Sequence, residues 1–250
     1  MTNKKDINAG IIIIGNEILS GRTKDTNTST LATWLNSLGI KVEEVRVIPD
    51  KKNIIIETVN LFRNKFKYVF TSGGIGPTHD DITSESISEA FNISYGAHKE
   101  AFSILEKYYK PGEFNDGRQK MAWMPVDANL ILNPTSGAPG FNVENVFCLP
   151  GVPSILKSML GGLKNSIIGG DPILSHTINL RTVESEIANS LTKVQDSNKE
   201  VEIGSYPFFQ AGKLGVSIVI RSENQSKIDI CTTQILDFVK QKKIEVVNRD

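Results

Sequence analysis

The stretch TSGGIGPTHDD, residues 71–81, decides how the rest of the sequence is interpreted. It follows the apolar run Tyr68-Val69-Phe70, which is typical of a buried strand, and it leads into a segment with helical spacing. Three glycines and a proline directly after a strand indicate a backbone that must approach something closely. In an open α/β sheet, ligands bind beyond the carboxyl ends of the strands, where this stretch is expected to lie.

Strands and helices alternate on both sides of this stretch. We predict strands at 7–14, 40–48, 67–71, 130–132 and 143–149. We predict helices at 27–38, 51–66, around 87–91, 97–109 and 153–160, with an irregular segment around 111–117. The alternation implies a mostly parallel sheet with helices on both faces, which is a three-layer α/β/α fold.

A second, smaller domain is expected in the C-terminal third of the chain. The glycines and proline of GGLKNSIIGGDP, residues 161–172, indicate a boundary. Beyond it, strands are predicted at 175–182, 200–206, 215–221 and 243–247, and helices at 184–197 and 225–240. This order matches the split βαβ motif of ferredoxin-like domains. We therefore expect an α/β domain over 1–168 and an α+β domain over 169–250.

Composition excludes some classes of partner. The 28 Lys and Arg residues balance 28 Asp and Glu, so no global field favours nucleic acid or an anionic membrane. Cys148 and Cys231 lie in apolar segments, which is typical of buried free thiols rather than of a disulfide or a metal site. The apolar run 11–14 is too short for a signal peptide or a membrane span. We expect a cytoplasmic protein that binds neither nucleic acid nor membranes.

The glycines of the opening stretch favour an anionic ligand. Gly73, Gly74 and Gly76 leave backbone N–H groups unshielded beside the positive end of the following helix, which favours a phosphate or another oxyanion. His79 stands where the third glycine of a dinucleotide fingerprint would fall, and no Gly-Lys-Ser/Thr of a P-loop follows. As a lone imidazole, His79 is more typical of a turn than of a metal site.

Two adjacent carboxylates, Asp80 and Asp81, follow the glycines, and a site for an anion does not explain them. A carboxylate of Asp80 or Asp81 beside a bound phosphate raises the energy unless a cation lies between them, and a magnesium-like ion would remove that conflict. The same carboxylate could instead orient a water or a ribose hydroxyl. In a purely structural interpretation, Asp80, Asp81 or Thr83 merely caps the helix. The turn alone leaves these alternatives open.

The loop GNEILSGRTKDTNT, residues 15–28, favours an active site. It is longer than the roughly two to six residues typical of such connections in α/β units. One of Asp25, Thr26 and Asn27 is expected to be the N-cap of the next helix. Glu17 adds an acidic group to the same loop.

Two further loops follow predicted strands. Asp50, directly after VIP, either caps the next helix or contacts a ligand. PTSGAPG, residues 134–140, has little chemistry of its own and is typical of a tight turn, and LPGVP, residues 149–153, follows closely. No Cys/His spacing resembles a zinc site, and no Ser/His/Asp arrangement can be inferred.

Five stretches together resemble the molybdopterin-binding domain family in its CinA-type branch: IIIIGNEILSGRTKDTNT, VIPD, TSGGIGPTHDDITSES, NPTSGAPGF and LPGVP. This branch includes the N-terminal halves of competence/damage-inducible protein A and the molybdopterin-binding-like domain of FAD synthase. The resemblance covers about residues 8–160, and EIGSYPFF, residues 202–209, is similar to the FAD synthase region. It implies a three-layer α/β fold, a nucleotide or pterin ligand over these loops, and a homo-oligomer. Because the sequence shows neither the further domain of full-length CinA proteins nor that of FAD synthase, we expect a stand-alone version.

The resemblance also implies roles for particular residues. The positions implied to bind phosphate or nucleotide are Gly73, Gly74, Gly76, Thr78, Asp25, Asn27, Asp50, Gly137 and Gly140. Asp81 matches the family's functional carboxylate and, with Asp80, is a candidate catalytic residue. Asp81, Asp80 and Glu17 are the candidate ligands of a divalent cation (Mg, Mn or Co), alone or together with K⁺.

Two departures from the family pattern bear on the activity. The cofactor-synthesis branch has Thr and a basic residue where this chain has Ile75 and Asp80, which weakens a role in molybdenum insertion. Asn16 stands where many members have Asp, so one carboxylate of the first loop is missing. We expect a metal-dependent hydrolase of nucleotide pyrophosphates of the FAD or ADP-ribose class. The alternatives are molybdopterin binding or adenylylation in molybdenum cofactor biosynthesis, and a non-enzymatic nucleotide-binding regulatory module.

Overall fold

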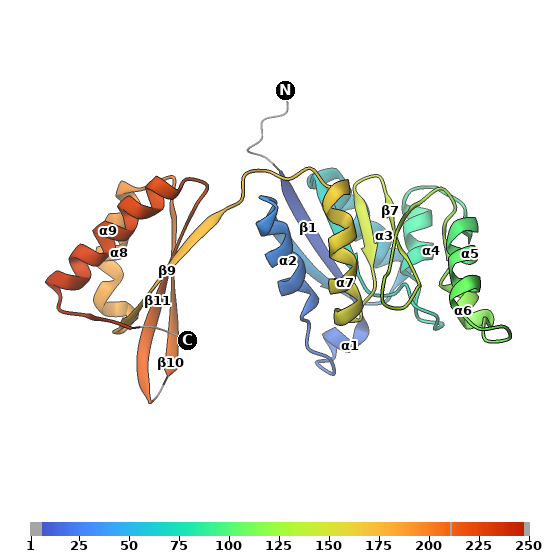
Figure 1. The fold of residues 1–250 in the computed structure, drawn as a ribbon, viewed down its shortest axis with the longest axis horizontal. Coiled ribbons are helices and arrows are strands. Elements are labelled where there is room, and N and C mark those ends of the chain that lie inside the picture. Colours follow the sequence, from blue (N-terminus) through green and yellow to red (C-terminus); the bar gives the residue numbers. More distant parts are fainter. Residues whose placement is uncertain (1–6, 211, 248–250) are drawn as a thin grey trace, which may run out of the picture. The chain divides into compact units, whose positions relative to one another are not determined.

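The chain divides into two compact units, Met1–Gly170 and Asp171–Asp250, each with its own core. The computed structural model describes residues 7–210 and 212–247 (Figure 1). The division lies two residues beyond the end of the predicted first domain, within the glycine-rich segment 161–172.

The first unit alternates strands and helices as expected. Its strands are β1 (Asn8–Ile14), β2 (Lys41–Ile48), β3 (Tyr68–Ser72), β4 (Tyr95–Ala97), β5 (Trp123–Pro125), β6 (Asn129–Ile131), β7 (Gly140–Val143) and β8 (Val146–Leu149). Its helices are α1 (Asn16–Leu19), α2 (Asn27–Ser37), α3 (Lys52–Lys65), α4 (Thr83–Ala90), α5 (Lys99–Tyr108), α6 (Asp116–Lys120) and α7 (Pro153–Leu163), followed by a short 3₁₀ helix (Lys164–Ser166).

Six of these strands form one mixed sheet in the order β2-β1-β3-β8-β7-β6. The pairs β1–β2, β1–β3 and β3–β8 are parallel, whereas β7 is antiparallel to both β8 and β6. The fold class predicted from the sequence, a mostly parallel sheet between helical layers, is confirmed.

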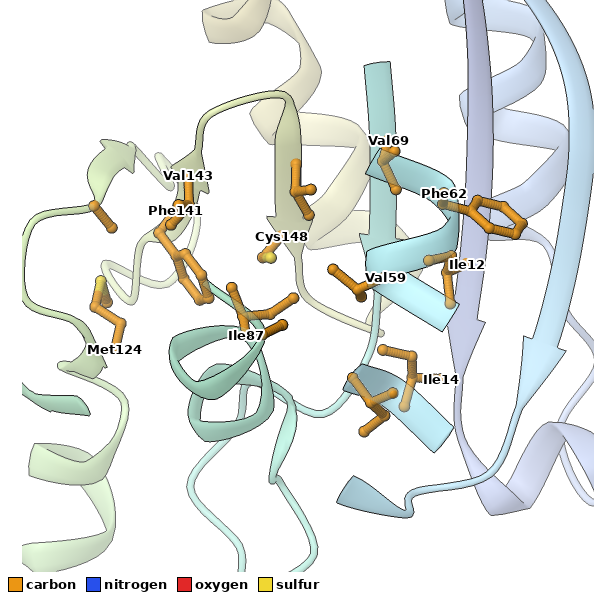
Figure 2. Packing of buried hydrophobic residues seen from close by; sticks show 14 of the residues in the cluster. Ile12, Ile14, Val59, Phe62, Val69, Ile87, Met124, Phe141, Val143 and Cys148 are labelled. Atoms are coloured by element: carbon orange, nitrogen blue, oxygen red, sulfur yellow. The ribbon is translucent and has the colours of Figure 1, made fainter. Parts of the chain in front are cut away.

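The apolar side chains of β1 pack on both faces of the sheet, because successive residues of a strand point to opposite sides. Ile12 and Ile14 join a cluster with Val59 and Phe62 of α3 and Ile87 of α4, which Figure 2 shows from close by. The intervening β1 residues pack on the opposite face in a second cluster with side chains of α2 and α7; its fully buried members include Ile11, Leu31, Leu35 and Leu156. Helices therefore cover both faces of the sheet.

The prediction of a single strand over 143–149 is wrong. The chain turns back at Glu144, whose φ of 49° lies in the left-handed region, and so forms the antiparallel hairpin β7–β8. One asparagine side chain bonds the backbone of this turn, and a second joins the turn to the end of α3. Asn142 donates to the carbonyl of Glu144, and Asn145 donates to the carbonyls of Arg63 and Phe66.

The segment between α4 and β6 is more regular than predicted. Strands β4 and β5 pair antiparallel as a separate two-stranded sheet, and neither strand was expected. The short helix α6 begins within the segment that was predicted to be irregular. Helix α5 lies where a helix was predicted, two residues shorter at its start and one at its end. The sequence also gave no sign of α1.

The second unit has the predicted element order. It contains β9 (Leu174–Arg181), α8 (Glu184–Ser197), β10 (Glu202–Gln210), β11 (Lys213–Ser222), α9 (Gln225–Gln241) and β12 (Glu245–Val246). Its antiparallel sheet has the order β10-β11-β9-β12, and both helices pack on one face of it (Figure 1). This is the arrangement expected for a split βαβ motif.

Both cysteines are buried free thiols, as predicted. Burial raises the pKa of the Cys148 thiol to about 12, so this side chain stays protonated at neutral pH. Within residues 7–210 and 212–247, no helix is both long and apolar enough to cross a membrane.

Candidate functional site

Five loops of the first unit meet at the carboxyl edge of its sheet. They follow β1, β2, β3, β8 and β6, because β6 runs in the same direction as β8. From β1 the chain continues to β2 on one side, and from β2 it crosses to β3 on the other. The crevice between the ends of β1 and β3 is therefore the topological switch point, where doubly wound sheets bind ligands.

Gly73 brings the ends of β1 and β3 into close contact. Its N–H donates to the carbonyl of Leu149 over 3.1 Å, and its φ is 111°. A Cβ at this position would lie 2.1 Å from the carbonyl oxygen of Ile14. A Cβ on Gly151, in the loop after β8, would lie 3.5 Å from the Cα of Gly73. The backbones of three loops thus converge where a side chain at 73 would force them apart.

The turn after Gly73 presents unpaired main-chain donors. In the described part of the chain, the N–H groups of Gly74, Ile75 and Gly76 donate to no protein acceptor. Gly74 has a φ of 70°, and its carbonyl accepts from the Thr83 N–H over 2.9 Å, which fixes the turn against the start of α4. Successive free N–H groups of this kind form an anion-binding concavity.

The carboxylates of Asp80 and Asp81 both approach the hydroxyl of Thr78. The Thr78 Oγ1 lies 2.6 Å from Asp80 Oδ1 and 2.5 Å from Asp81 Oδ2, and the Thr78 N–H donates to Asp81 Oδ2 over 2.8 Å. A hydroxyl has one proton and can donate to only one of the two carboxylates. The other close contact joins two oxygens without a proton between them, so the group favours an additional cation or proton.

Neither carboxylate caps α4. The N-cap position of that helix is Ile82, and no side chain accepts a hydrogen bond from its first turn. The capping interpretation of Asp80, Asp81 and Thr83 is therefore wrong. The hydrogen bond from Thr78, with smaller contributions from the nearby His79 and Lys120 charges, lowers the pKa of Asp80 and keeps it ionised.

Asn27 ties three of the edge loops together. Its side chain is only 6% exposed, and its Nδ2 donates to Ser72 Oγ over 2.9 Å and to the Gly151 carbonyl over 2.7 Å. The Ser72 hydroxyl in turn donates to the carbonyl of Pro150. The Asn27 Oδ1 is buried and accepts no hydrogen bond from the described residues. One side chain thus fixes the start of α2 against the ends of β3 and β8.

Replacing Asn27 with alanine should lower the free energy of unfolding of the first unit by about 1–3 kcal/mol, because the Gly151 carbonyl would lose a buried donor. Urea unfolding followed by circular dichroism would measure the change. The matched control is Asn36→Ala on the exposed side of the same helix, expected to stay within about 0.5 kcal/mol of wild type. Equal free energies of unfolding for the two variants would show that the hydrogen bonds of the Asn27 side chain do not stabilise the first unit.

Asp25 and Asp50 hold the loops after β1 and β2. Thr26 occupies the N-cap position of α2, but the Asp25 Oδ1 is the atom that accepts from the first N–H groups, those of Asn27 and Thr28. The Asp50 Oδ2 accepts from the Asn16 N–H over 2.8 Å instead of capping the next helix. Burial raises the pKa of Asp50, and the charges of Glu17 and Asp80 add to the shift.

The predicted cation ligands do not form a complete metal site from protein alone. Within residues 7–210 and 212–247, no group of three or more His, Cys, Asp or Glu side chains could hold a metal ion. Glu17 folds back over Gly15, while Asp80 and Asp81 share the Thr78 hydroxyl. Two carboxylates fit a magnesium-like ion that takes its other ligands from water and substrate phosphates, which is the usual mode for this ion.

Gly137 and Gly140 each have a packing reason to be glycine. A Cβ on Gly137 would lie 2.7 Å from the ring of Tyr108, and the φ of Gly137 is 75°. A Cβ on Gly140 would lie 2.5 Å from the carbonyl oxygen of Cys148 on the neighbouring strand. Contact of either residue with a ligand stays a prediction.

Lys120 is a residue of this edge that the sequence did not suggest. Its Nζ donates to the carbonyl of Thr78, 42 positions away in the chain. Lys120 ends α6, a helix that was not predicted, so no spacing rule connects it to the glycine turn, residues 73–76.

A cavity of about 240 Å³ beside α7 and β6 is lined by none of the predicted site residues.

Comparison with known families agrees with this geometry. Residues 10–170 match the family described as "Probable molybdopterin binding domain", and residues 172–248 match the middle domain of FAD synthase. The first match covers more than half of the chain.

Relatives of similar length are found in archaea. A protein of Archaeoglobus fulgidus is 36% identical over 234 residues, covering 93% of this chain and 98% of that protein. A protein of Aeropyrum pernix is 34% identical, covering 84% of this chain and 82% of that protein. Among solved structures, the protein CinA from Thermoplasma acidophilum, of unknown function, aligns with a TM-score of 0.61 at 31% identity. That alignment covers 65% of this chain and 98% of the other.

Proposed function

Because the chain belongs to the molybdopterin-binding domain family in its CinA-like form, joined to a domain like the middle domain of FAD synthase, we propose that it hydrolyses a nucleotide pyrophosphate with the help of a divalent cation. The substrate would be of the FAD or ADP-ribose class. One observation carries this proposal: a turn with three free N–H groups lies directly before two carboxylates that both contact the single hydroxyl of Thr78.

The turn and the carboxylates suit different parts of such a ligand. Free N–H groups at Gly74, Ile75 and Gly76 would bind phosphate oxygens, which carry the negative charge. Asp80 and Asp81 repel a phosphate unless a cation intervenes, so they would hold a divalent ion that also contacts the phosphates. Such an ion supplies charge neutralisation and polarises the phosphoryl oxygen when it is bound.

The reaction adds water across the phosphoanhydride. The oxygen of a water forms a bond to one phosphorus, the bridging P–O bond breaks, and the electron pair of that bond leaves with the second phosphate. One proton of the water is lost to a nearby base and a phosphate product takes up a proton from solvent. Main-chain donors fixed before the reaction stabilise the charge that develops on the phosphate. Asp81, whose carboxylate accepts from the Thr78 N–H, would orient the water or hold the cation.

The proposal is tested with metal-stripped protein. FAD, ADP-ribose and NAD are incubated separately with Mg²⁺, Mn²⁺ or Co²⁺, with and without K⁺, and the products are separated by chromatography. We expect release of AMP from at least one nucleotide that depends on the added divalent ion and stops when EDTA is in excess. AMP release that continues in excess EDTA would contradict the cation's role.

The family match supports a second candidate, molybdopterin binding with or without adenylylation, because the matched domain is described as a probable molybdopterin-binding domain. A pterin that binds while no nucleotide does would favour this candidate. Tight nucleotide binding without any product would instead favour a non-enzymatic regulatory module.

A further inference from the structure

A lysine from α6 places its positive charge next to the glycine turn. The Lys120 ammonium donates to the carbonyl of Thr78, the residue whose hydroxyl and N–H hold Asp80 and Asp81. The Thr78 carbonyl also accepts from the Asp81 N–H. The ammonium is therefore bound to the residue that organises both carboxylates.

The position of Lys120 is fixed by the segment that bears it. The Asn115 side chain accepts from the Arg118 N–H at the start of α6, and the Gln119 side chain donates to the Phe114 carbonyl over 3.0 Å. The Arg118 guanidinium lies 4.2 Å from the centre of the Tyr109 ring. These contacts hold α6 against the segment that precedes it, residues 109–115, so the backbone that bears Lys120 is fixed in place.

The charges of the turn make this ammonium significant. Asp80 and Asp81 bring two negative charges to a turn whose proposed ligand is itself an anion. The Lys120 ammonium is bound to the Thr78 carbonyl, and the hydroxyl and N–H of the same residue hold the two carboxylates to which a divalent ion would also bind.

We propose that Lys120 is a counter-ion for Asp80 and Asp81. Its ammonium binds the phosphate of the ligand, and it competes with the divalent cation for interaction with the two carboxylates. The ligand class and the divalent cation at Asp80 and Asp81 both rest on the proposed function, whereas the Mn²⁺ titration measures the competition without any nucleotide. The inference assigns a binding role to α6. Its specific consequence is that loss of Lys120 changes nucleotide affinity and metal affinity in opposite directions.

The test compares Lys120→Met and Lys120→Arg with wild type. ADP-ribose is titrated by calorimetry in excess EDTA, and Mn²⁺ alone is titrated by electron paramagnetic resonance. We expect Lys120→Met to weaken ADP-ribose binding about tenfold or more, the effect of losing one charged hydrogen bond. The same variant should bind Mn²⁺ about threefold tighter or more, because one competing charge is gone. Lys120→Arg should keep both affinities within about threefold of wild type.

Two controls separate this role from a merely structural one. Lys107→Met removes an exposed lysine of α5 and should change neither affinity. Thermal unfolding shows whether each variant is folded. A folded Lys120→Met protein with unchanged Mn²⁺ affinity would overturn the inference, whatever happens to ADP-ribose. If wild-type protein binds neither ADP-ribose nor FAD when Mg²⁺ is present, the proposed function fails, and the Mn²⁺ titration still decides the role of Lys120.

Discussion

Asp81→Asn is expected to lower the turnover of a nucleotide pyrophosphate by about 10²–10³-fold, the usual cost of removing one preorganised electrostatic group from an active site. The substitution removes a negative charge while keeping the shape of the side chain. With the amide oxygen of Asn in the place of Oδ2, the side chain can still accept from both the Thr78 N–H and the Thr78 hydroxyl. Metal-dependent AMP release, measured as kcat and KM for the preferred substrate, gives the effect.

The matched control for this prediction is Asp127→Asn, which makes the same chemical change at an exposed position outside the proposed site. Its turnover should equal that of wild type. Thermal unfolding of both variants should agree with wild type within a few degrees, since neither change buries a new unpaired group. Undiminished turnover of Asp81→Asn would remove Asp81 from the mechanism.

The chain's alternation of strands and helices was predictable because each element has a strong local pattern. Helices such as α3 carry apolar residues at helical spacing, and β1 is a continuous apolar run, as expected for a strand covered on both faces. The structure confirms this prediction for β1, since Ile12 and Ile14 pack on one face and Ile11 and Ile13 on the other. Local pattern therefore sufficed for the central sheet.

Short elements without a strong pattern were missed. The hairpin β7–β8 looked like one strand because its turn contains neither glycine nor proline, and Glu144 adopts a positive φ that few non-glycine residues adopt. Strands β4 and β5 have three residues each, and their pairing joins segments that lie far apart in the sequence. Such pairing depends on contacts between distant segments rather than on periodicity.

The candidate site was predictable as a set of loops but not as a set of contacts. Glycines and carboxylates mark the loops in the sequence, whereas only the structure shows that Asp80 and Asp81 turn back to Thr78 instead of capping α4. Lys120 is the clearest case, because no motif relates it to a turn 42 residues away. Spacing rules predict contacts within one helix or strand, but not contacts between segments that are distant in the sequence.

Gly73→Ala is expected to be the most destabilising single-methyl change at the edge of the sheet. The new Cβ would stand 2.1 Å from the carbonyl oxygen of Ile14, a backbone atom at the end of β1, and residue 73 directly follows β3, which pairs with β1, so neither strand end can move alone. Strain at a φ of 111° costs about 1–3 kcal/mol, and overpacking adds about 1–3 kcal/mol. Calorimetry should show a drop in Tm of about 4–24 °C, which is 2–4 °C for each kcal/mol in a domain of this size.

The control is Gly112→Ala, which places the same methyl group at a φ of 85° with no atom within 4 Å of the new Cβ. This variant bears only the left-handed backbone strain, about 1–2 kcal/mol. The difference between the two variants therefore measures the close approach of β1 and β3. Equal losses would show that the two strand ends move apart easily, and a glycine at 73 would then be required only for its backbone conformation. A much larger drop in Tm for Gly73→Ala would establish that the ends of β1 and β3 are held together by direct backbone contact, which leaves no room for a side chain at position 73.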